Sequence, residues 1–173
     1  MPQTIFRRAS WSAIAAIVVL TCAFPARSQR VGDWLFFRDL TLTPGFDPDP
    51  VVLRGVSGGN FSAAEITADS HTSTGLCRGF FNVDPDHELR LSDPFPSLRL
   101  FVIGAGDTTL IVRGPGGTWC NDDYDGHDPG IAGQWLAGTY QIWVGSHSQD
   151  EYHPYAIELS EIELPEPPLR IQN

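Results

Sequence analysis

The segment TTLIVRGPGGTWC, residues 108–120, indicates the fold class of this 173-residue chain. Residues 108–112 are almost all β-branched or apolar, which is typical of a strand that is buried on both faces. Residues 114–117, Gly-Pro-Gly-Gly, form a strong turn signal, and residues 118–120 then begin another strand or extended segment. The segment therefore predicts β-structure in which one strand is covered on both sides.

Similar short segments recur along the chain between clusters of glycine, proline and aspartate. In several of them apolar residues alternate with other residues, as expected when one face of a strand is buried. The predicted strands are residues 51–56, 77–83, 87–91, 98–103, 108–112, 118–120, 140–144 and 155–159. About eight short strands separated by turns predict an all-β fold, an antiparallel jelly-roll-like β-sandwich. Residues 61–69 fit either a helical turn or a loose strand.

The N-terminus has the features of a secretory signal peptide, which we assign to residues 1–28. Arg7 and Arg8 form a positively charged start, and residues 11–20 form a short apolar core. Residues 26–28, Ala-Arg-Ser, place small side chains where a signal peptidase cleaves. We therefore expect a secreted or periplasmic protein with no stable membrane span after cleavage.

Two alternatives to cleavage remain, an uncleaved membrane anchor and a lipoprotein signal at Cys22. The apolar core is short for a membrane-spanning helix, which favours cleavage. The expected organisation is a signal peptide at 1–28, an N-terminal extension at 29–39, a β-sandwich domain at 40–162 and a C-terminal tail at 163–173.

The chain is strongly acidic, and its cysteine count is low. It contains 11 arginines and no lysine against 21 acidic residues, so nucleic acid and anionic lipid are not expected as partners. Removal of the signal peptide leaves two cysteines, Cys77 and Cys120. An oxidising compartment and an even count favour a disulfide between them, and two free buried thiols are the alternative.

The segment NDDYDGHD, residues 121–128, contains four carboxylates and predicts a calcium site. It matches the first half of an EF-hand loop, but Ala132 stands where that loop needs glutamate and no helical pattern flanks it. We therefore expect a calcium-binding turn of another kind, and a solvated acidic turn is the alternative. The candidate ligands are Asp107, Asn121, Asp122, Asp123, Asp125 and Asp128.

Other motifs give weaker signals. Residues 55–59 match the nucleophile pattern G-x-S-x-G, but the chain lacks the alternation of strands and helices that this motif needs. A catalytic triad is conceivable in residues 146–153, but a polar loop between two strands accounts for its candidate members, which are Ser146, His147, Asp150 and His153. The five histidines show no paired spacing that would mark a zinc site.

Aromatic side chains near the acidic segment are candidates for stacking on a sugar ring. A place in the hydrophobic core is the alternative for each of them. The residues are Trp119, Tyr124, Trp135 and Trp143.

Several motifs together resemble one bacterial domain family. The most specific are WCNDD at 119–123 and YQIWVG at 140–145, and they are accompanied by GDTTL at 106–110 and CRGF at 77–80. Over roughly residues 40–161 the sequence is similar to the pre-peptidase C-terminal domain, a jelly-roll-like module found beside secreted proteases. The resemblance implies an exported, non-catalytic and sometimes calcium-binding sandwich. It also implies a disulfide between Cys77 and Cys120 and an ion site around Asp107 and residues 121–123.

These observations predict an exported, non-catalytic binding or accessory domain that calcium stabilises. Its expected partner is an extracellular protein, a polysaccharide or a component of the cell envelope. One alternative is a small secreted hydrolase that uses histidine and carboxylate side chains, and another is a purely structural envelope protein.

Overall fold

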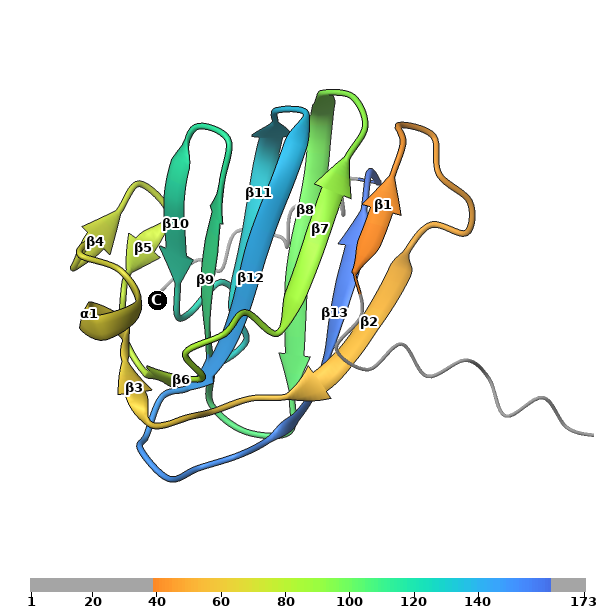
Figure 1. Cartoon of the computed structure of the whole chain (residues 1–173). Helices are drawn as coiled ribbons and strands as arrows, with labels where there is room; N and C mark the ends of the chain where they lie inside the picture. The colour runs from red at the N-terminus through yellow and green to blue at the C-terminus, as the bar shows by residue number, and fades with distance from the viewer. Residues whose placement is uncertain (1–38, 163–173) are drawn as a thin grey trace, which may run out of the picture. The chain divides into compact units, whose positions relative to one another are not determined.

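A computed structural model describes residues 39–162, and this part of the chain is almost entirely β-structure (Figure 1). Eight of its thirteen strands contain five or more residues, so the predicted all-β class is confirmed. The predicted signal peptide and C-terminal tail lie outside the described residues. The elements are β1 (Leu40–Leu42), β2 (Val51–Val56), β3 (Phe61–Ser62), α1 (Ala63–Ile66), β4 (His71–Thr72), β5 (Gly75–Leu76), β6 (Phe80–Phe81), β7 (His87–Leu91), β8 (Phe95–Gly104), β9 (Thr108–Gly114), β10 (Gly117–Asn121), β11 (Gly130–Trp135), β12 (Gly138–Ser146) and β13 (Pro154–Ser160).

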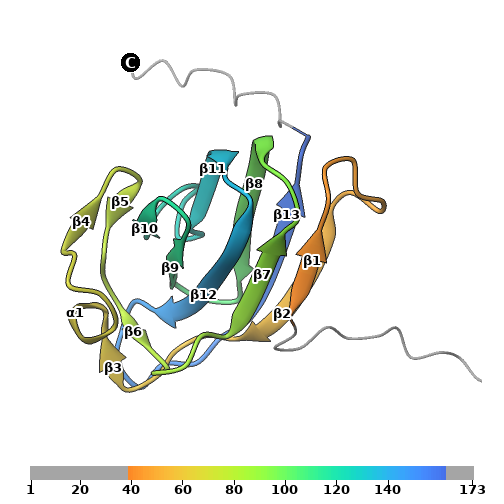
Figure 2. The same cartoon turned by 45° about the horizontal axis from the view of Figure 1, so that its top comes forward.

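Two sheets form the sandwich, as Figures 1 and 2 show. The seven-stranded sheet contains β1, β7, β12, β9 and β10, and the short strands β6 and β3 join it at β12. The four-stranded sheet has the order β11-β8-β13-β2, and β4 and β5 form a separate hairpin. Within the described residues, β1 and β7 are the only pair that runs parallel.

The main hydrophobic core lies between the two sheets. Alternation along β8 illustrates how the sequence builds it, because Leu98, Leu100 and Val102 are fully buried while the side chains between them are more exposed. Burying a side chain of this size contributes about 1.5–3 kcal/mol. Tyr155 and Ile157 of β13 pack into the same core, as their predicted alternation requires.

A second, smaller core lies on the outer face of the seven-stranded sheet. Ile111 of β9 and Trp143 of β12 pack there against Phe81 of β6. The predicted disulfide is present, since Cys77 and Cys120 are joined with 5.1 Å between their Cα atoms. Strand β9 therefore has hydrophobic neighbours on both faces, which confirms the prediction from residues 108–112.

The structure differs locally from the predicted set of strands. The strand predicted at 77–83 is reduced to β6, because Gly79 has a φ of +96° and packs so closely that an added Cβ would lie 2.5 Å from Oγ1 of Thr109. Residues 61–69, for which a helical turn or a loose strand was expected, contain both a short strand and a helical turn. Strand β11 was not predicted. Between residues 39 and 162, no helix has the length and apolar character needed to cross a membrane.

Candidate functional site

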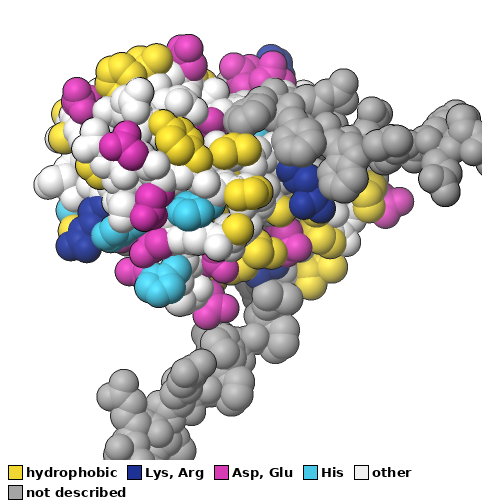
Figure 3. Space-filling model, turned by 90° about the horizontal axis from the view of Figure 1, so that it is seen from below, with side chains coloured by type: hydrophobic (Ala, Val, Ile, Leu, Met, Phe, Trp, Pro, Cys, Tyr) yellow, Lys and Arg dark blue, Asp and Glu magenta, His cyan; other side chains and the backbone are white. Residues whose placement is uncertain are grey.

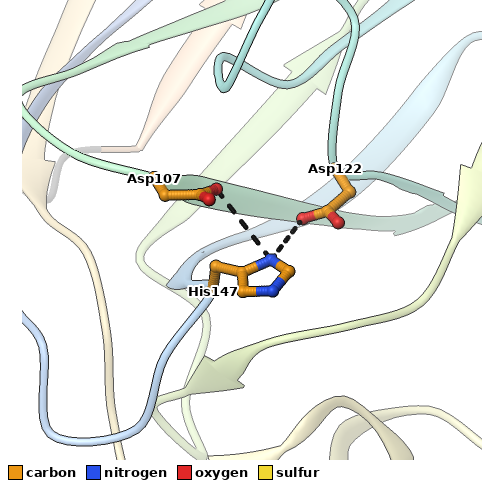
Figure 4. Close-up of side chains that lie close together, drawn as sticks. All are labelled: Asp107, Asp122 and His147. Atoms are coloured by element: carbon orange, nitrogen blue, oxygen red, sulfur yellow. Dashed lines mark hydrogen bonds and ion pairs between the residues drawn. The ribbon is translucent and has the colours of Figure 1, made fainter.

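The sheet topology brings three polar side chains together at one end of the sandwich. Asp107 precedes β9, Asp122 follows β10 and His147 follows β12. Because β9 is antiparallel to both β10 and β12, its start lies beside their ends. Figure 4 shows the three side chains facing one another, and in Figure 3 histidine and carboxylate side chains lie close together on this end.

The distances define a compact cluster of two carboxylates and an imidazole. Nδ1 of His147 lies 3.4 Å from Oδ1 of Asp122 and 3.9 Å from Oδ1 of Asp107. One ligand atom from each residue lies within 4.8 Å of the others. The exposed His127 approaches from the other side, with Nδ1 at 3.4 Å from Oδ2 of Asp107. Two of the predicted ligands therefore meet, together with a histidine that was not among the candidates.

Within this cluster, burial has the largest effect on the pKa of Asp122. The Asp122 side chain is only 8% exposed, and this burial raises its pKa, an effect that the neighbouring His147 opposes. Oδ1 of Asp107 is shielded from solvent and has no hydrogen-bond partner among the described residues. Within residues 39–162, the ion pairs of both carboxylates involve histidines rather than arginine.

The other predicted ligands lie elsewhere. The Asn121 side chain holds neighbouring segments together. Its Nδ2 donates to the carbonyl of Thr74 at 2.8 Å, and its Oδ1 accepts from the amide of Gly130 at 2.9 Å. Oδ1 of Asp128 accepts from the amide of Gly104 at 2.9 Å. Asp123 and Asp125 are exposed. The structure thus gathers two of the six predicted ligands at the cluster.

The role of Asn121 can be measured by its removal. We expect Asn121→Ala to lower the free energy of unfolding by about 2 kcal/mol, because a buried side chain that bonds two backbone groups is lost. Urea denaturation measures the change, and Asp123→Ala, at the exposed neighbouring aspartate, is the control with less than about 0.5 kcal/mol expected. Equal effects of the two substitutions would contradict this role.

The serines and His153 of the hydrolase alternative make separate contacts. Oγ of Ser146 bonds Oγ of Ser57 at 2.8 Å in the protein interior, and Ser57 also accepts from the backbone amide of His153. The imidazole of His153 instead lies 3.4 Å from Glu151. Ser57, the serine of the G-x-S-x-G match, is completely buried.

An aromatic pocket lies at the opposite end of β9, next to the turn that joins β9 to β10. Its volume is about 270 Å³. The half-buried Trp119 stacks on Trp135 with ring centroids 6.5 Å apart and an interplanar angle of 29°, and Tyr140 packs against Trp135 at 4.9 Å. Polar lining comes from Thr74 and Gln134.

Two of the four predicted stacking residues therefore line one pocket, and the other two lie outside it. Tyr124 is exposed and packs edge-on against Phe101 at 6.0 Å. Trp143 is buried in the second core, where the guanidinium of Arg113 lies 5.2 Å above its ring. Periodicity distinguished the two faces of β12 but did not indicate that the face carrying Trp143 is also covered, by the second core.

A buried carboxylate near the start of β7 was missed by the sequence analysis. Burial raises the pKa of Asp86 to about 6, although the amide of Val144 donates to its Oδ2 at 2.8 Å. Next to it in the chain, Nε2 of His87 lies 2.8 Å from the hydroxyl of Tyr155. Burial, followed by the charge of Asp86, raises the pKa of Tyr155. The turn-like sequence Asp84-Pro85-Asp86 does not indicate that Asp86 is buried.

Comparison with known proteins found similarities both in sequence and in structure. An uncharacterized protein of Synechococcus elongatus is 35% identical over 86 residues, which are 47% of this chain and 63% of that protein. The chain thus spans less than two thirds of that relative. The pre-peptidase C-terminal domain of the Bacillus anthracis collagenase is similar in structure over 70% of this chain and 94% of that domain, with a TM-score of 0.42 and 7% identity. No family model matches the sequence.

Proposed function

We propose that this protein is an exported, non-catalytic binding domain that takes a neutral polysaccharide in its aromatic pocket. The observation that supports this function best is the stack of Trp119 on Trp135 beside a cavity of about 270 Å³. Binding pockets are typically lined by aromatic and apolar side chains with a few polar groups that orient the ligand.

A sugar ring suits this lining because it has an apolar face of C–H groups and a rim of hydroxyls. The apolar face can lie against the partly exposed indole of Trp119, and the hydroxyls can bond Thr74 and Gln134 at the rim. The excess of 21 acidic residues over 11 arginines repels polyanions, which favours a neutral polysaccharide over an acidic one.

Export is the second part of the proposal, and it rests on residues 1–28 and on the disulfide. A signal-like N-terminus and a disulfide between Cys77 and Cys120 both suit an oxidising, extracytoplasmic compartment. The hydrogen bond between Ser57 and Ser146 supports a binding role over the hydrolase alternative, because it keeps both hydroxyls inside the protein.

We expect Trp119→Ala to weaken polysaccharide binding at least tenfold, because it removes the partly exposed ring of the stack. Tenfold corresponds to about 1.4 kcal/mol. The measurement is retention of the exported protein on insoluble cellulose, chitin and mannan, followed by titration of the soluble oligosaccharide that matches the retaining polymer. Tryptophan fluorescence reports this titration because Trp119 and Trp135 lie at the pocket.

Tyr124→Ala is the matched control, since Tyr124 is an exposed aromatic residue outside the pocket. Its binding is expected to equal that of the unaltered protein. Lack of retention on all three polymers, or equal loss in the two variants, would contradict the proposed pocket. Circular dichroism and thermal melting establish that each variant is folded.

A further inference from the structure

We infer that Asp107, Asp122 and His147 bind one divalent transition-metal ion of the zinc class, and that the calcium ion expected from the sequence is not the ion of this site. This inference is independent of the polysaccharide pocket. It rests on the charge of the cluster, on its donor atoms and on its position at three strand ends.

The first argument is charge. Two carboxylates converge here, and the Asp122 side chain is more than nine-tenths buried. In the part of the chain that the structure describes, no arginine forms an ion pair with either carboxylate. Burying charge is costly unless it is paired or bound to a metal. A dication would neutralise both carboxylates and would also satisfy Oδ1 of Asp107, which is shielded and lacks a hydrogen-bond partner among residues 39–162.

The second argument concerns the donor atoms. Calcium takes six to eight oxygen ligands, whereas this cluster offers two carboxylates and an imidazole nitrogen. The side chains predicted to complete a calcium shell do not reach this cluster as free ligands, because both polar atoms of the Asn121 side chain bond backbone groups and Asp123 and Asp125 are not part of the cluster. Imidazole together with carboxylate is a typical ligand set for zinc and related metals.

The third argument is geometric. Tetrahedral coordination at zinc-ligand distances of 2.0–2.1 Å places neighbouring ligand atoms about 3.4 Å apart. Nδ1 of His147 lies 3.4 Å from Asp122 and 3.9 Å from Asp107, so small side-chain movements would bring the three atoms to these positions. The same 3.4 Å is long for a charge-assisted hydrogen bond, which typically measures about 2.7–2.9 Å. The exposed His127, beside Asp107, or a water molecule can supply the fourth ligand.

The position of the cluster indicates what the metal does. The three ligands come from the connections β8–β9, β10–β11 and β12–β13, so one ion joins three loops that are distant in sequence. The seven residues of β9 separate the cluster from the Pro115 turn at the aromatic pocket, a distance of about 23 Å. The ion would therefore stabilise the loop end of the sandwich without contacting a ligand in the pocket.

The test is metal binding by the exported protein with its disulfide intact, after removal of metals with a chelator. Calorimetric titration with Zn²⁺ is expected to give one site per chain, and added Zn²⁺ is expected to raise the melting midpoint by several degrees. Co²⁺ serves as a spectroscopic probe, because tetrahedral coordination with an imidazole gives intense visible absorption. Millimolar Ca²⁺ is expected neither to shift the melting midpoint nor to displace Co²⁺.

His147→Ala and Asp122→Asn are expected to weaken Zn²⁺ binding at least 100-fold. The matched control is His153→Ala, which removes a histidine that also lies 3.4 Å from a carboxylate but belongs to no three-residue cluster. His147 is on the surface, so its variant remains informative if Asp122→Asn does not fold. Absence of Zn²⁺ binding would overturn the inference, as would equal affinity in the His147 and His153 variants or displacement of Co²⁺ by Ca²⁺.

Discussion

Loss of the Cys77–Cys120 disulfide is expected to lower the free energy of unfolding by about 4 kcal/mol. The two cysteines are 43 residues apart, and opening a loop of that length restores a corresponding chain entropy to the unfolded state. Loss of the disulfide also destabilises the folded state, because the disulfide belongs to the second core together with Phe81 and Trp143. Urea denaturation of the oxidised and reduced protein measures the difference.

The double variant Cys77→Ala/Cys120→Ala is the control for the disulfide. It should resemble the reduced protein in its urea midpoint, and reductant should have no further effect on it. The two cysteines pack against a small apolar cluster, so alanine leaves a modest cavity without burying a polar group. An unchanged midpoint on reduction of the unaltered protein would contradict the proposed contribution.

Asp86 is expected to make the protein less stable at neutral pH than at acidic pH, by about 3 kcal/mol for this group alone. Its pKa is about 6 in the folded protein, compared with the ordinary value of 3.8, and each pKa unit corresponds to about 1.4 kcal/mol. The folded state therefore holds the proton more tightly. The resulting stabilisation is fully present below about pH 4 and is lost as the pH rises through about 6.

Asp86→Asn removes this titration. Because an amide oxygen can still accept from the amide of Val144, the variant should gain up to about 3 kcal/mol relative to the unaltered protein between pH 4 and pH 8. Urea denaturation at a series of pH values measures the difference, and Asp84→Asn, at an exposed aspartate nearby, is the control. Parallel pH profiles for the unaltered protein and Asp86→Asn would refute the assignment.

Much of the fold could be predicted because hydrophobic periodicity reports burial directly. Residues 108–112 lack alternation since Ile111 packs outward and Leu110 packs inward, each into its own core. Strand β11 escaped prediction because GIAGQW contains two glycines and a shift in register between Gly133 and Trp135, which break the two-residue period. The parallel pairing of β1 with β7 depends on a contact between distant segments, which local patterns do not encode.

The site was predictable only in part, for a similar reason. The acidic composition of residues 121–128 made Asp122 a candidate, and Asp107 was included because it opens the neighbouring strand; the structure brings these two side chains together. His147 reaches the cluster only because β12 pairs with β9, and no spacing rule relates residues 122 and 147. Trp119 of β10 and Trp135 of β11 meet although they belong to different sheets, whereas Tyr124, close to both in sequence, lies elsewhere.

The length of β9 affects how substitutions in the loops at its two ends combine. Its two ends carry different loops, with the Pro115 turn at one and the Asp107 connection at the other, and a strand whose first five residues are buried separates them. Substitutions that far apart are usually additive in free energy. Either set of loops can therefore diverge, or be redesigned for a new ligand, while the opposite set keeps its own specificity.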